Sequence, residues 1–247
     1  MEILLIIVGI IVGSLSGFFG IGGGTILVPM LIVLGYNIKT AIGISVMQMV
    51  FSSLYGSWLN HRNKNLNLKD GLAIGFGGFV GALGSGWLVS SVPEIILELM
   101  FVAVVIFALY RFFHTPTNSL TQKSHTVSSY ILGIIGVFIG LFAISMGVGG
   151  SILLTPILVG FLYYPIKKAV SAGLFFVVFS SISGFISLSI AGHIDYIDGF
   201  IIGISSLLGV QIGIWIANKT GQKKHKNALI VLYVIILFLM IKKLFGI

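Results

Sequence analysis

The chain of 247 residues is strongly apolar: 57% of its residues are hydrophobic, 8% are charged and 33 are glycines. This composition lies far outside that of soluble globular domains and indicates an integral membrane protein. Basic residues in the loops between apolar spans explain the net charge of +8 better than nucleic-acid binding does. The absence of cysteine excludes disulfides, thiolate metal sites and cysteine nucleophiles.

Hydropathy predicts ten apolar helices, five in each half of an all-α membrane protein. The helices of the first half are predicted at residues 2–18, 21–35, 40–59, 71–91 and 95–112. Those of the second half are predicted at residues 128–145, 148–162, 168–190, 197–217 and 228–244. We therefore expect a first membrane repeat over 1–113, a polar linker over 114–127 and a second membrane repeat over 128–247.

The two halves of the chain share sequence motifs in the same order. Residues 20–29 read GIGGGTILVP and residues 147–156 read GVGGSILLTP, 127 positions later. The correspondence continues at a spacing of 128 positions through Lys39 and Lys167, residues 50–53 and 178–181, and Trp87 and Trp215. Because five helices per half is an odd number, the halves are expected to cross the membrane in opposite senses, as the inverted repeats of many secondary transporters do.

The distribution of lysine and arginine predicts the orientation. Eleven of the fourteen fall in loops that would share one face, namely 60–70, 111–127, 163–168 and 218–227. The positive-inside rule then places these loops in the cytoplasm and both termini on the outer side of the membrane. Four crossings per half would divide the charges seven to seven, and we reject that topology.

Charge counting leaves one alternative open for the first two helices. They either cross the membrane twice or form a re-entrant hairpin that enters and leaves on the outer face. Residues 3–34 offer about 16 residues per arm, roughly 24 Å of helix, which is slightly less than the ~30 Å hydrocarbon core. Both topologies are therefore compatible with the sequence.

The Gly-rich segments are the first candidate binding residues. Five glycines fall within residues 17–24, and each costs a helix about 0.5–1 kcal/mol relative to alanine, so a helix should break there and a new one begin. Helix N-termini bind anions through free N–H groups and the helix dipole. The predicted substrate-binding residues are Gly20, Gly22, Gly23, Gly24, Thr25, Gly147, Gly149, Gly150 and Ser151. Close helix packing is the competing explanation for these glycines.

Polar residues of the third helix in each half are the second group of candidates. Ser45, Gln48 and Ser52 share one helix face, and Ser180 belongs to a similar face in the second half, so these four join the predicted substrate-binding set. Hydrogen bonding between helices is the alternative role for the serines. No span centre carries an Asp or Glu, and no cluster has metal-ligand spacing. The sequence thus predicts no catalytic residue, no metal and no cofactor.

The paired motifs, together with Ala41-Ile42-Gly43 and Trp87, resemble those of the TauE/SafE family of sulfite exporters over essentially the whole chain. The second motif departs from the first by having Ser151 for Gly24 and Ile152 for Thr25. The resemblance implies a bacterial inner-membrane permease, not an enzyme, for sulfite, an organosulfonate such as sulfoacetate, or a related sulfur-containing anion. Alternating access is the expected mechanism, and an anion channel with the same helix-terminus site is the alternative.

Overall fold

The computed structural model describes residues 2–63, 68–114, 128–160 and 166–244, and all regular structure in them is helical. The first half contains α1 (Glu2–Phe19), α2 (Gly24–Val33), α3 (Ile38–Arg62), α4 (Leu68–Ala82), α5 (Ser85–Ser91) and α6 (Glu94–His114). The second half contains α7 (Ser129–Ser145), α8 (Ser151–Gly160), α9 (Ile166–Ile190), α10 (Tyr196–Lys219) and α11 (Gln222–Leu244). Among the described residues, six helical spans are long and apolar enough to cross a membrane. The predicted all-α membrane fold is confirmed.

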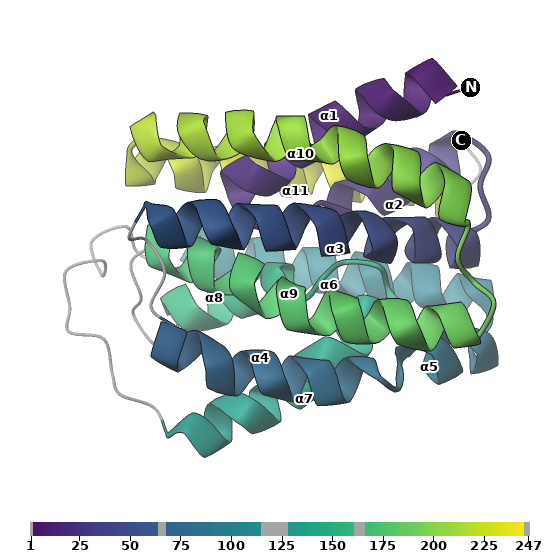
Figure 1. Ribbon diagram of the computed structural model, residues 1–247, viewed down its shortest axis with the longest axis horizontal. Helices are drawn as coiled ribbons and strands as arrows, with labels where there is room; N and C mark the ends of the chain where they lie inside the picture. The colour runs from purple at the N-terminus through teal and green to yellow at the C-terminus, as the bar shows by residue number, and fades with distance from the viewer. Residues whose placement is uncertain (1, 64–67, 115–127, 161–165, 245–247) are drawn as a thin grey trace.

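The helices lie side by side, with α3 and α9 between the α1–α10 pair and the α4–α7 pair (Figure 1). Each of the two central helices buries 67% of an 18-residue apolar stretch inside the protein. The predicted linker 114–127 lies outside the described residues, apart from His114 at the end of α6.

Both Gly-rich segments form the turn of a helical hairpin. Figure 1 shows α1 entering from the end of the molecule that carries both termini and α2 returning to it, whereas α7 and α8 form a hairpin from the opposite end. With 10 residues each, α2 and α8 are only about 15 Å long, half of a ~30 Å hydrocarbon core. Their length favours the re-entrant hairpin over two full crossings.

The two predicted repeats are interlocked through glycine contacts. The first helix of each repeat packs against the fourth helical region of the other, α1 on α10 and α7 on α4. A Cβ on Gly13 of α1 would overlap the carbonyl oxygen of Ser206, and one on Gly140 of α7 would overlap that of Gly78. Glycine therefore allows the backbones to touch, as in small-residue helix interfaces of membrane proteins.

The predicted helix at 71–91 is wrong in one respect, because Leu83 and Gly84 divide it into α4 and α5. Ser187 of α9 inserts its hydroxyl at the break. Its Oγ donates to the Leu83 carbonyl at 2.6 Å and accepts from the Gly86 N–H at 2.9 Å. A side chain that satisfies the freed backbone groups is a recognised cause of helix interruption.

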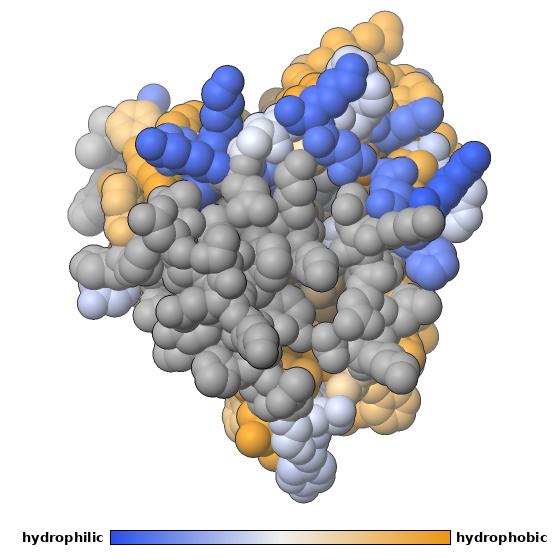
Figure 2. Space-filling model, turned by 90° about the vertical axis from the view of Figure 1, so that its left-hand side faces the viewer, coloured by the Kyte–Doolittle hydropathy of each residue, from blue (hydrophilic) through white to orange (hydrophobic). Residues whose placement is uncertain are grey.

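The end of the molecule opposite the termini is the basic one. There α3 and α10 end and α11 begins, and Figure 2 shows hydrophilic residues gathered over these elements. The exposed basic side chains described at this end are Arg62, Lys219, Lys223 and Lys224. These four basic side chains and the chain termini therefore lie at opposite ends of the described protein (Figure 1).

Candidate binding site at the glycine-rich turns

The two Gly-rich turns have the same backbone conformation. In the first turn, Gly20, Gly22 and Gly23 have φ of 68°, 76° and 84°. The matched glycines Gly147, Gly149 and Gly150 have φ of 68°, 78° and 81°. L-residues with a side chain rarely adopt these left-handed values, which explains why the motif consists of glycine. One local structure is thus built twice, each time immediately before a helix N-terminus.

The turns also share their packing partners. A Cβ on Gly22 would lie 3.3 Å from Sδ of Met49 and 3.0 Å from Cγ1 of Val177, and a Cβ on Gly149 would meet the same two side chains. Met49 and Val177 are themselves 128 positions apart. Each of these two glycines therefore contacts one residue of its own repeat and the matched residue of the other repeat. The other matched pairs are Gly20 with Val170, and Gly147 with Ile42.

In this state the two turns are in direct contact. A Cβ on Gly24, the first residue of α2, would overlap the carbonyl oxygen of Gly147. Ser45 of α3 donates a hydrogen bond of 2.8 Å to that same carbonyl. Both predicted site segments therefore come together in the middle of the protein. An anion between Gly24 and Gly147 requires that the turns first move apart.

The polar side chain of Gln48 lies against the first turn. It is fully buried, and a Cβ on Gly23 would lie 2.6 Å from its Oε1 and 3.0 Å from its Nε2. Neither amide atom has a hydrogen-bond partner among the described residues. A buried unpaired polar group costs about 1–3 kcal/mol, and buried amides in native proteins normally have partners. This orphaned amide is the strongest indication of a ligand site.

The second turn has an aromatic residue where the first has this amide. Phe176, at the position equivalent to Gln48, lies where a Cβ on Gly150 would be. Two matched helices thus present a hydrogen-bonding group to one turn and a ring to the other. The site is polar on the side of the first repeat and apolar on the side of the second.

The predicted hydroxyls divide into two groups. Thr25 and Ser151, each beside a helix N-terminus, are fully buried and have no hydrogen-bond partner among the described residues. Ser52 Oγ lies 3.4 Å from the Gly22 carbonyl and within the same distance of a carbonyl of its own helix, whereas Ser180 bonds the Phe176 carbonyl of its own helix at 3.2 Å. The hydroxyls of Thr25 and Ser151 are therefore unpaired among the described residues, whereas Ser52 and Ser180 lie against backbone carbonyls.

Met49, Val177 and Phe176 are the contact residues that the sequence analysis missed. Each lies at a repeat-matched position, so the spacing of 128 residues was the signal that could have found them. The side chains that surround the turn glycines are all uncharged. Within the described part of the chain, no three His, Asp or Glu side chains are placed to hold a metal ion.

The end that carries the termini is bound together by polar contacts between repeats. The Tyr36 hydroxyl, in the turn before α3, donates to Asp198 Oδ2 of α10. Burial, and next the hydrogen bond to this carboxylate, raise the pKa of Tyr36 to about 12. Ser90 Oγ lies 2.9 Å from Nε2 of His193, whose pKa is lowered by burial.

A helical membrane protein in which two glycine-rich hairpin turns meet between matched halves has the architecture of a secondary transporter. The family model described as sulfite exporter TauE/SafE matches residues 5–240. The chain belongs to the TauE/SafE family of membrane transporters.

Relatives with reviewed descriptions agree with this assignment. A probable membrane transporter protein of Methanocaldococcus jannaschii is 31% identical over 233 residues, which cover 91% of this chain and 86% of the relative. The probable membrane transporter protein YdhB of Bacillus subtilis is 26% identical, with 92% and 94% covered. The names of these relatives state transport and no substrate. No solved structure shows a significant match to the chain.

Proposed function

We propose that this chain is a permease that moves a small sulfur-containing oxyanion, sulfite or an organosulfonate such as sulfoacetate, across a bacterial inner membrane. The observation that carries the proposal is the fully buried, unpaired amide of Gln48 beside the first Gly-rich turn. Family membership supports the substrate class.

The anion would bind to neutral donors only. Backbone N–H groups at the start of α2 and α8 carry partial positive charge, and the Gln48 amide and the hydroxyls of Thr25 and Ser151 lie close by. Hydrogen bonds from such donors to an anion are stronger than those to a neutral acceptor. The side chains nearest the turn glycines are uncharged, so no opposite charge in direct contact with the turns would retain the anion.

Alternating access would follow from the two hairpins. We infer that the halves are inverted repeats, because their turns and contacts correspond while their hairpins enter from opposite ends of the protein. One hairpin enters from the end with the termini and the other from the basic end (Figure 1). Moving either hairpin away from Met49 and Val177 would expose the turns to one side of the membrane at a time.

Orientation gives a first test. Because Arg62, Lys219, Lys223 and Lys224 lie at the end opposite the termini (Figure 1), we expect this end in the cytoplasm and both termini in the periplasm. An alkaline phosphatase fused to the C-terminus should be active, and a cytoplasm-dependent fluorescent protein in its place should be dark. The reverse pattern would contradict the proposed orientation.

Flux through proteoliposomes tests the function directly. We expect saturable uptake of hydrogen sulfite that responds to an imposed membrane potential, because moving one negative charge gains about 2.3 kcal/mol per 100 mV. Flux should persist without a proton or sodium gradient, since the groups around the turns are uncharged. Liposomes without protein are the control. Flux that does not saturate would favour the channel, and flux that stops when protons are clamped would contradict uncoupled transport.

A further inference from the structure

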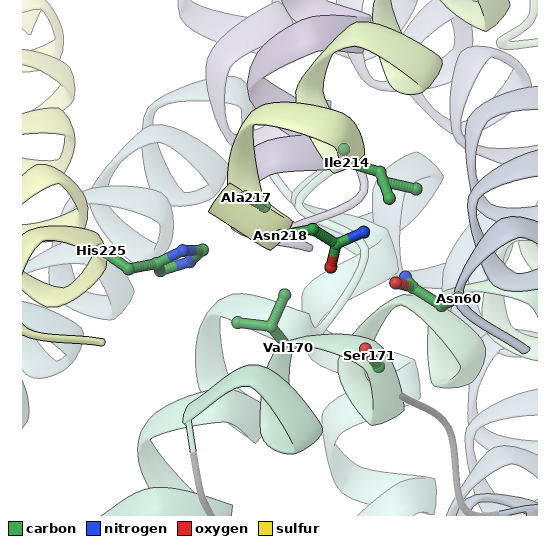
Figure 3. Close-up of a pocket in the computed structure, with 8 residues that line it drawn as sticks. Asn60, Val170, Ser171, Ile214, Ala217, Asn218 and His225 are labelled. Carbon is green, nitrogen blue, oxygen red and sulfur yellow. The ribbon is translucent and has the colours of Figure 1, made fainter. Parts of the chain in front are cut away.

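A second polar site lies at the basic end, between the loops and the first Gly-rich turn. Figure 3 shows a pocket there in which the amides of Asn60 and Asn218 face each other and the ring of His225 points in from the other side. Ser171 completes the polar lining. The four side chains come from α3, α10, α11 and α9, so the pocket exists only in the folded protein.

One side chain separates this pocket from the first turn. Val170 lines the pocket, and a Cβ on Gly20 would overlap its Cγ1. His225 stacks on Phe18, which lies two residues before Gly20, with ring centroids 4.7 Å apart and planes at 17°. The pocket therefore borders the first Gly-rich turn on the side of the basic end.

The two ends of the protein differ at the positions that line this pocket. The residue that corresponds to Asn60 in the other half is Leu188, which is fully buried. At two further positions the pocket has a smaller residue than the other half: Gly17 corresponds to Ile144, and Ala217 to Val89. Ser171 and Ile214 are instead larger than their counterparts Gly43 and Gly86, so the clearest difference between the two ends is the Asn60 amide in place of a buried leucine. The asymmetry lies in the sequence and does not depend on the conformational state.

Charge around the pocket favours anions. The exposed side chains of Arg62, Lys219, Lys223 and Lys224 lie on the elements that form its rim, at the end where hydrophilic residues gather in the upper part of Figure 2. Like charges that line the approach to a recess raise the local concentration of opposite ions. Inside the pocket, the carboxamides of Asn60 and Asn218 supply neutral N–H donors.

We propose that this pocket is a second anion-binding subsite, at the basic end of the transport path. A small oxyanion accepts hydrogen bonds from Asn60 and Asn218 there and then passes Val170 to reach the Gly-rich turns. The space that water can enter is about 20 Å³, enough for one water molecule. A space of this size does not admit an oxyanion, so the anion binds when the side chains part. This inference rests on the proposed function for the identity of the transported anion.

Asn60→Leu is the first test, because leucine occupies the equivalent position in the other repeat. We expect about a tenfold loss of apparent affinity for sulfite in proteoliposome flux, the effect of losing one hydrogen bond to an anion. Asn63→Leu is the matched control. Asn63 is exposed and ends the same helix outside the pocket, so its variant should keep wild-type affinity. Equal effects of the two variants, or none at Asn60, would overturn the proposal.

Thiol labelling tests the pocket without relying on sulfite transport. The chain has no cysteine, so Asn218→Cys introduces a single thiol. The thiol is labelled with a methanethiosulfonate reagent that carries a sulfonate and, separately, with one that carries a cation. We expect the ratio of the two reaction rates, anionic over cationic, to be at least tenfold higher at this position than for a free thiol. Asn227→Cys, exposed on α11 outside the pocket, controls for the surface field and should show a smaller preference. Equal preferences would overturn the subsite. Anion preference at Asn218→Cys in a protein without sulfite flux would contradict the proposed function alone.

Discussion

Replacing Gly23 by valine is expected to abolish sulfite binding in protein that still folds and inserts. The backbone at Gly23 has φ of 84°, a left-handed conformation that costs an L-residue roughly 1–2 kcal/mol. A Cβ there would also lie 2.6 Å from Oε1 of Gln48 and 3.0 Å from Cγ1 of Val12. Valine would therefore displace the one unpaired amide of the candidate site. Isothermal titration of purified, monodisperse protein with sulfite measures the loss.

Gly192 provides the matched control for backbone strain. Its φ is 74°, close to that of Gly23, but a Cβ at Gly192 would meet no atom within 4 Å. Gly192→Val should therefore carry the same strain and keep sulfite affinity. Gly150→Val, which would strike Phe176, should lose affinity as Gly23→Val does. Wild-type affinity in folded Gly23→Val protein would move the site elsewhere.

Much of the fold follows from the sequence because apolar length and repeated motifs are local properties. The Gly-rich breaks fall where the glycine pattern predicts them, since several left-handed residues in succession require glycine. The N-terminus of α3 is also a local signal, as the Asn37 side chain accepts from the Thr40 N–H. Charge counting could not decide whether the first two helices cross or re-enter, because both topologies leave every later loop on the same side.

The features that the sequence analysis missed depend on contacts between repeats. The division between α4 and α5 is made by Ser187, which lies about a hundred residues later in the chain. The sequence around Gly84 does not predict a contact with Ser187. The pairing of Gln48 with one turn and Phe176 with the other likewise appears only when α3 and α9 are packed against the hairpins. The repeat spacing could have matched these two residues with each other, but it could not have shown what they face.

Gln48→Leu is expected to raise the stability of the protein and to abolish sulfite binding. Leucine has nearly the volume of glutamine and no polar atoms, so it removes a buried amide that has no partner among the described residues. An unsatisfied buried group costs about 1–3 kcal/mol, so the apparent melting temperature without ligand should increase. The same change removes a side-chain donor that lies against the first turn, and titration with sulfite should show no binding.

Gln211→Leu separates this effect from the general effect of replacing glutamine in a membrane helix. Gln211 is exposed on α10, and its Oε1 accepts from the Tyr55 hydroxyl at 3.3 Å, far in sequence from either turn. Its leucine variant should bind sulfite with wild-type affinity and gain no stability. A ligand site is a place where a protein keeps a polar group unpaired until the ligand arrives, so stability and binding must move in opposite directions at Gln48. Lower stability together with unchanged affinity in Gln48→Leu would show that the amide holds the fold together and does not meet the anion.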